Sequence, residues 1–210
     1  MKRMKRNFWA SLTGLLFLAS LGCATIDSKP PIKNPQILES NLPSAQLITG
    51  VPWYRQGRKE CGPTSIAMVL NFYGRKVTKD EIARCVMSAG KFGTELEQLE
   101  YYAEQQQGLM TYRLYDRTKD KSSMKYLIAQ GYPLIAIGRI PQNWHSKWAP
   151  LWEGHYVVVV GYDDVTKNLI IQDPAWGKKG YEMTKVPYKS FADFHTHSQF
   201  PGLVLCIYPK

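Results

Sequence analysis

The chain has 210 residues, of which 44% are hydrophobic, a length that suits one folded domain and is short for two. Its formal net charge is +10, but no run of Lys and Arg marks a nucleic-acid footprint, so binding to DNA or RNA is not expected. A modest positive excess spread along the chain suits a protein that faces anionic membrane or envelope surfaces.

A secretion signal is predicted at the N-terminus. Four basic residues between Lys2 and Arg6 precede an apolar run, Phe8–Leu21. The run is shorter than the roughly 20 apolar residues that span a bilayer, so removal of residues 1–22 is favoured over their retention as an anchor. Loss of the signal lowers the formal net charge from +10 to +6, because the signal carries four Lys or Arg and no acid.

The residues around Cys23 resemble the lipobox of bacterial lipoproteins, in which the cysteine is acylated and becomes the mature N-terminus. They read LASLGCA over residues 18–24, with Ser20 where that pattern usually has Leu. The resemblance implies a lipid anchor on Cys23 in the cell envelope, on the outer membrane facing the periplasm if the cell is Gram-negative. An ordinary secretory signal that happens to contain a cysteine is the alternative.

Residues 23–46 are predicted to form a flexible, extended tether. The stretch holds prolines at positions 30, 31, 35 and 43 and has no sustained helical or strand period. The folded domain is then expected over residues 47–210. Within it, Cys85 and Cys206 are interpreted either as buried apolar side chains or as a mutual disulfide, which export would permit.

Helices are predicted early in the domain and strands late. The predicted helices are Gly62–Tyr73, one after a capping box of Thr78 and Glu81, one after a capping box of Thr94 and Glu97, and one from about Ser123 to Gly131. The predicted strands, rich in Val, Ile and Tyr, are Leu109–Tyr115, Pro133–Ile140, His155–Tyr162, Leu169–Gln172 and Gly202–Tyr208. This order indicates an α+β domain with N-terminal helices packed on a mostly antiparallel sheet.

Cys61 is the candidate nucleophile. It stands immediately before the helix that Gly62 and Pro63 open, where unpaired N–H groups and the positive end of the helix dipole favour a thiolate over a thiol. Five residues upstream, the amide of Gln56 can donate a hydrogen bond to a developing oxyanion, beside the backbone N–H of Cys61. A turn with a buried thiol would explain Cys61 equally well if it stood alone, so the assignment depends on finding a base.

His155 is the candidate base, and Asp173 is the candidate partner that orients it. The apolar run from His155 to Tyr162 predicts a buried strand, and Leu169–Gln172 predicts the second strand of a hairpin. His155 and Asp173 then fall at the same end of the pair, where the carboxylate can accept a hydrogen bond from the imidazole. A count of residues across the loop leaves them offset, so a bulge or a twist must close the gap.

No metal or organic cofactor is expected. His195 and His197 could suggest a metal pair, but no carboxylate or cysteine lies at ligand spacing, and a surface turn explains them as well.

Residues 56–65, 154–163 and 173–174 resemble the motifs of the bacteriocin-processing, double-glycine-leader cysteine peptidases. The resemblance implies a papain-like fold, with Cys61 and His155 as catalytic pair, Asp173 orienting His155, and Gln56 completing the oxyanion hole. Family members that cut leader peptides are fused to a membrane transporter, whereas this sequence contains no GxxxxGK[ST] motif, so its substrate is left open.

These features predict a cysteine endopeptidase that cleaves an exported or envelope polypeptide by thiolate acyl transfer. Two alternatives use the same residues. One is a related amidase, deamidase, transglutaminase or cell-wall peptide hydrolase, and the other is a catalytically idle peptide-binding domain. The oligomeric state stays open.

Overall fold

The structure is a computed structural model, which describes residues 42–87, 93–116, 121–140, 154–176, 183–196, 198 and 200–210. The predicted signal, Cys23 and the predicted tether as far as residue 41 lie outside the described residues. Among the residues that are described, no helix has the length and apolar character needed to cross a bilayer.

The predicted helices and strands are all present, with ends shifted by a few residues. The helices are α1 (Cys61–Phe72), α2 (Lys79–Val86), α3 (Leu96–Glu104), α4 (Ser122–Ala129) and α5 (Tyr188–Thr196). The strands are β1 (Ala45–Leu47), β2 (Leu109–Tyr115), β3 (Leu134–Gly138), β4 (His155–Asp163), β5 (Asn168–Gln172), β6 (Thr184–Pro187) and β7 (Leu203–Pro209). The sequence did not predict β1, β6 or α5.

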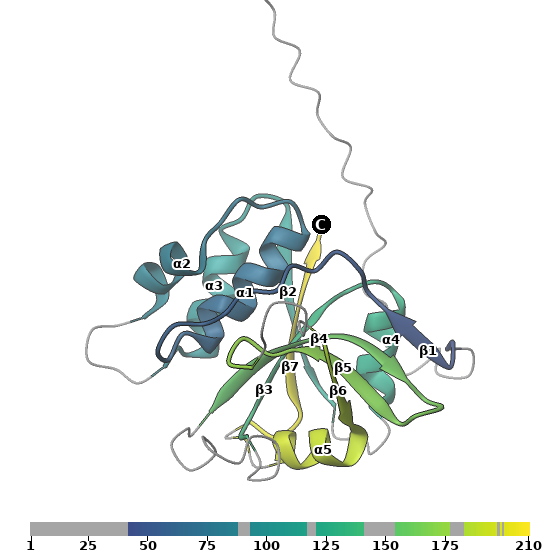
Figure 1. Cartoon of the computed structure of the whole chain (residues 1–210). Helices are drawn as coiled ribbons and strands as arrows, with labels where there is room; N and C mark the ends of the chain where they lie inside the picture. The colour runs from purple at the N-terminus through teal and green to yellow at the C-terminus, as the bar shows by residue number, and fades with distance from the viewer. Residues whose placement is uncertain are drawn as a thin grey trace, which may run out of the picture.

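The strands form one antiparallel sheet in the order β2-β7-β3-β4-β5-β6, with β1 paired to β4. In Figure 1, α1, α2 and α3 gather on one side of the molecule, α4 lies near β1, and α5 lies at the far end of the sheet. Helix α1 contacts β4, and both are buried along most of their length. The predicted α+β class, with N-terminal helices on a mostly antiparallel sheet, is confirmed.

Strand β1 extends the folded domain slightly beyond its predicted start at residue 47. Ala45 pairs with Asp163, and Gln46 pairs with Tyr162. The last residues of the predicted tether therefore belong to the sheet. A three-residue strand has too few positions to show a period of two, which explains why the sequence did not predict it.

The two predicted capping boxes have different outcomes. Thr78 caps α2 as predicted, because its hydroxyl accepts from the Glu81 N–H at 3.2 Å and Glu81 accepts from the Thr78 N–H at 2.8 Å. The prediction of a box beginning at Thr94 is wrong. Glu95 is the N-cap residue of α3, and its N–H donates to Oε1 of Gln98 at 3.2 Å. Thr94 is thereby free to line a pocket.

Cys85 and Cys206 are not bonded to each other. Cys206 is buried in β7, whereas Cys85 is exposed on α2. The interpretation as a buried apolar side chain is therefore confirmed for Cys206 and wrong for Cys85.

The interpretation of His195 as part of a surface turn is wrong. His195 lies in α5 with 1% of its surface exposed, and its ring centroid is 4.5 Å from that of Phe191 and 5.8 Å from that of Phe194. Neither ring nitrogen has a hydrogen-bond partner among the described residues. Burial, with a smaller contribution from the charge of Lys121, lowers the pKa of His195 to about 3.

Replacement of His195 by leucine is expected to reduce the loss of stability in acid. The pKa of His195 in the folded protein is about 3, below the value of 6.5 in the unfolded chain, so the unfolded chain takes up this proton first as the pH falls. Between pH 7.5 and pH 5, this group alone lowers the free energy of unfolding by about 2 kcal/mol. Urea unfolding of the wild type and of His195→Leu at both pH values measures this loss. Between pH 7.5 and pH 5, the free energy of unfolding should fall by about 2 kcal/mol less in His195→Leu than in the wild type. Equal losses in the two proteins would contradict this assignment.

Candidate active site

The N-terminus of α1 places Cys61 beside the sheet. A tight turn precedes the helix, in which Glu60 accepts a hydrogen bond from the Gly57 N–H at 2.9 Å and pairs with Lys79 at 2.7 Å. A Cβ atom at position 57 would stand 2.4 Å from the Glu60 carboxylate, so a larger residue there would displace the Glu60 side chain. Lys59 adopts a left-handed backbone conformation, with φ of 64°. The turn thus fixes the chain just before the thiol.

A bulge in β4 brings His155 and Asp173 onto the same face of the hairpin. Between Asp163 and Gly161, β4 and β5 pair in regular register, with Gly161 opposite Ile170. Val160 is an extra residue in β4, and beyond it the register shifts by one. An unbroken register would place Asp173 opposite position 158, on the other face from His155. The shifted register places it opposite position 157, on the same face as His155. The bulge or twist that the sequence required is therefore present.

His155 and Asp173 form a buried, charge-assisted hydrogen bond. Nε2 of His155 lies 2.8 Å from Oδ1 of Asp173, and the two residues are 0% and 2% exposed. The same carboxylate oxygen accepts from the Ala175 N–H at 2.8 Å, which fixes its orientation. Two hydrogen bonds, one with the His155 imidazole and one with the Ala175 N–H, therefore position the Asp173 carboxylate.

The electrostatics favour a protonated imidazole next to the sulfur. Burial alone lowers the pKa of His155, but the charge and hydrogen bond of Asp173, followed by the hydrogen bond and charge of Cys61, together raise it to about 10. Because Nε2 faces Asp173, Nδ1 is the nitrogen that remains for the thiol. The structure thus brings Cys61, His155 and Asp173 together in the order thiol, imidazole and carboxylate.

Gln56 lies on a segment that is fastened to the end of β5. The Gln56 N–H donates to the Pro174 carbonyl at 2.9 Å, and Nε2 of Gln172 donates to the Val51 carbonyl at 2.8 Å. Oε1 of Gln56 is buried without a partner among the described residues. The backbone of Gln56 is therefore held near the carboxylate end of the site, and no described hydrogen bond joins its side chain to Cys61.

A pocket of about 140 Å³ opens beside Cys61. Its walls come from the residues that lead into α3 (Gly93–Leu96), the end of β3, the start of β4, and the residues Ser198 and Phe200. Cys61 is only 6% exposed and lines this pocket, so a substrate in the pocket lies next to the residue. Glu95 is an exposed acidic side chain in the pocket wall.

Two residues that the sequence did not single out support the site. Nε1 of Trp53 donates to the Asp173 carbonyl at 2.9 Å, and the Tyr156 hydroxyl donates to the Thr94 carbonyl at 3.0 Å. Burial raises the pKa of Tyr156, and the nearby Cys61 raises it further. The position of Tyr156 next to His155 was a usable signal, whereas nothing in the sequence linked Trp53 to a residue 120 positions away.

The family comparison covers most of the folded chain. A family model described as the Peptidase_C39 like family matches residues 48–200, which include Gln56, Cys61, His155 and Asp173. No curated protein matches the chain at a significant level.

Solved structures with a similar fold are cysteine peptidases. A putative C39-like peptidase from Bacillus anthracis is 19% identical with a TM-score of 0.58, and the match covers 79% of this chain and 98% of that chain. A double glycine motif protease from an AMS/PCAT transporter is 24% identical with a TM-score of 0.52, covering 79% and 99%. Xylellain, a cysteine protease from Xylella fastidiosa, is 15% identical with a TM-score of 0.61, covering 87% and 91%.

These likenesses confirm the papain-like fold that the sequence motifs implied. The match over residues 48–200 decides the family, because it spans more than half of the chain. The chain therefore belongs to the Peptidase_C39 like family and is a cysteine peptidase.

Proposed function

We propose that Cys61 is the nucleophile of an endopeptidase, that His155 is its acid and base, that Asp173 orients His155, and that Gln56 helps to hold the oxyanion. The observation that carries the proposal is the buried chain of contacts from Cys61 through His155 to Asp173. Its end at Cys61 opens into a pocket.

The reaction is acyl transfer. The Cys61 thiolate attacks a peptide carbonyl, and the resulting oxyanion accepts hydrogen bonds from the Cys61 N–H and the amide of Gln56. Protonated His155 gives its proton to the leaving amine as the C–N bond breaks. Neutral His155 then takes a proton from the water that attacks the thioester, which releases the carboxylic acid product and restores the Cys61 thiolate and protonated His155. The raised pKa of His155 keeps the first proton available at neutral pH.

Replacement of Gln56 by alanine is expected to lower kcat by about 10²-fold with a small change in KM, because an oxyanion donor acts mainly on the transition state. Peptide hydrolysis by the purified protein measures both constants. Gln130→Ala, which removes an exposed glutamine after α4, is the matched control and should keep the wild-type rate. A Gln56→Ala enzyme with unchanged kcat would remove Gln56 from the oxyanion site.

The substrate that we propose is an exported or envelope polypeptide. A leader peptide is bound in the related double glycine motif protease, which supports a polypeptide in the cleft of this chain. A signal over residues 1–22, acylation of Cys23 and a tether over residues 23–41 would hold the domain at the membrane surface of the envelope. This location restricts the clients to proteins that have left the cytoplasm.

Cells that carry Cys61→Ala in place of the wild-type chain test the substrate class. Mass spectrometry of envelope protein termini should reveal a precursor that stays uncut in the mutant and is processed in the wild type. Unchanged termini with altered cell-wall fragments would favour a cell-wall peptide hydrolase instead. Metabolic labelling with a fatty acid, compared between wild type and Cys23→Ala, tests the anchor, since label on the mutant would contradict acylation at Cys23.

A further inference from the structure

The segment before the nucleophile carries a dense positive charge. Residues 55–60 read RQGRKE, which places Arg55, Arg58 and Lys59 within six residues of Cys61. Arg55 and Arg58 are exposed, and neither forms an ion pair with an acidic group among the described residues. These three basic residues, the 55–59 cluster, give the segment before Cys61 a positive charge.

The acidic groups near the cluster are already engaged. Glu60 accepts from the Gly57 N–H at 2.9 Å and pairs with Lys79 at 2.7 Å. Asp173 is 2% exposed and bonded to His155 at 2.8 Å. The positive charge of Arg55 and Arg58 is therefore left for a group that comes from outside the described chain.

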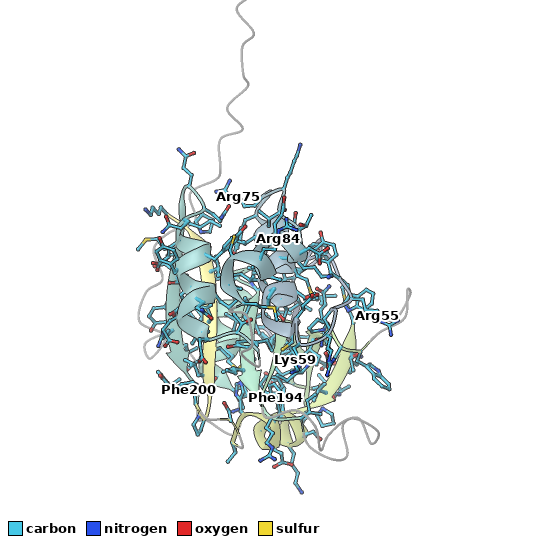
Figure 2. The ribbon with its side chains drawn as sticks, turned by 90° about the vertical axis from the view of Figure 1, so that its left-hand side faces the viewer. Arg55, Lys59, Arg75, Arg84, Phe194 and Phe200 are labelled. Carbon is cyan, nitrogen blue, oxygen red and sulfur yellow. The ribbon has the colours of Figure 1, made fainter. Side chains whose placement is uncertain are left out.

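The cluster lies outside the pocket, and Cys61 adjoins both, because it lines the pocket and follows Lys59 by two residues in the chain. The pocket is lined by residues at the start of α3 and by Phe200, and no residue of the cluster lines it. Figure 2 places Phe200 toward the left of the molecule, Lys59 near the middle and Arg55 at the right edge. A polypeptide that crosses Cys61 would therefore pass from the pocket to the cluster.

The position of His155 gives the chain direction of such a polypeptide. The leaving amine must receive its proton from His155, so the part of the substrate after the scissile bond continues past the imidazole. Beyond the imidazole lies Asp173, and the segment of Gln56 is bonded to Pro174 there at 2.9 Å. The residues C-terminal to the cut therefore face the 55–59 cluster, and those N-terminal to it face the pocket.

We infer that Arg55 and Arg58 select substrates with acidic residues on the C-terminal side of the scissile bond. The inference rests on the proposed peptidase function. Glu95 acts in the same direction, because its exposed carboxylate in the pocket wall repels acidic residues on the N-terminal side. The pocket wall thus carries a negative charge at Glu95, and the segment before Cys61 carries positive charges at Arg55 and Arg58. An exposed charge pair changes the rate by about threefold, so the two arginines together give about a tenfold preference.

A library of peptides from denatured bacterial proteins, with cleavage sites mapped by mass spectrometry, tests the inference. Wild type should cut sites in which Asp and Glu are enriched in the first few positions after the cut, and this enrichment should weaken at high ionic strength. The double variant Arg55→Glu/Arg58→Glu should lose the enrichment and favour Lys and Arg there. The control Lys76→Glu/Lys185→Glu makes the same change of net charge at exposed residues outside the 55–59 cluster and should cut like wild type.

Three results would overturn the inference. The charge-reversed variant could retain the wild-type pattern, or acidic residues could be enriched before the cut instead of after it. The inference would also fail if charge reversal abolished binding to phosphatidylglycerol vesicles and left the cleavage pattern unchanged, since the arginines would then face a membrane. Failure of the proposed peptidase function looks different, because wild type and Cys61→Ala would then leave the same peptides uncut.

Discussion

Replacement of Cys61 by alanine is expected to lower the rate of peptide hydrolysis by about 10⁴-fold or more, because the sulfur forms the covalent intermediate and no described side chain can replace it. The fold should survive, since the substitution removes one sulfur atom from a residue that still has 6% of its surface exposed at the edge of a pocket. Hydrolysis of a peptide that the wild type cuts, measured with the purified variant, gives the ratio of rates.

Cys85 provides the matched control for this experiment. It is an exposed free cysteine on α2, so Cys85→Ala removes one thiol without touching the site. We expect Cys85→Ala to keep the wild-type rate. Retention of more than about 1% of the activity in Cys61→Ala, with unchanged circular dichroism, would show that another group carries the reaction.

Replacement of Asp173 has two separable effects. Asparagine keeps the oxygen that accepts from Nε2 of His155 and from the Ala175 N–H, both at 2.8 Å, but it removes the negative charge. We expect Asp173→Asn to lower kcat/KM at pH 7 by about tenfold, and Asp173→Ala to lower it by about 10³-fold, because alanine also leaves a buried N–H unsatisfied.

The pH profile distinguishes orientation from packing. In the wild type, the charge of Asp173 is the largest factor that raises the pKa of His155, which reaches about 10, so activity should persist until the pH approaches that value. Without the charge, burial lowers the pKa, and the alkaline limb of kcat/KM in Asp173→Asn should move toward neutral pH. Asp163→Asn removes a carboxylate from the turn of the same hairpin and should leave the limb in place. An unmoved limb in Asp173→Asn would reduce Asp173 to a packing role.

His155 and His195 change the free energy of unfolding with pH in opposite directions. The folded pKa of His155 lies above its unfolded value, so its contribution to the free energy of unfolding is complete below about pH 6.5 and is lost as the pH rises to about 10. His195 behaves in the reverse way, since its folded pKa is about 3. Its contribution is complete at neutral pH and is lost in acid.

The hairpin of β4 and β5 shows which structural features could be predicted from the sequence and which could not. The valine run after His155 and the apolar run before Asp173 predicted both strands, because a buried strand needs a continuous apolar stretch. The residue count also required an irregularity, since a regular pairing left Asp173 offset. The sequence could not locate the bulge at Val160, because a valine there fits a regular strand as well as a bulged one.

Helix α5 and Gln56 illustrate two different limits. A helical spacing of three and four residues is present in Tyr188, Phe191 and His195, so the sequence did contain a signal for α5. The signal was passed over because His195 and His197 were interpreted as part of a surface turn. Gln56 is different, because its place depends on contacts with Pro174, which lies far away in sequence. Long-range contacts of a loop leave no local pattern, and only the folded chain reveals them.

The rate of alkylation of Cys61 by iodoacetamide at pH 7, followed by mass spectrometry, tests the central claim most directly. We expect Cys61 to react faster than Cys85, although Cys61 is 6% exposed and Cys85 is exposed, because the neighbouring His155 can take up the proton of the thiol as the sulfur reacts. His155→Gln keeps an amide that can donate to Asp173 and should slow Cys61 by about 10²-fold without affecting Cys85. Equal rates at the two cysteines, or an unchanged rate at Cys61 in His155→Gln, would contradict the account.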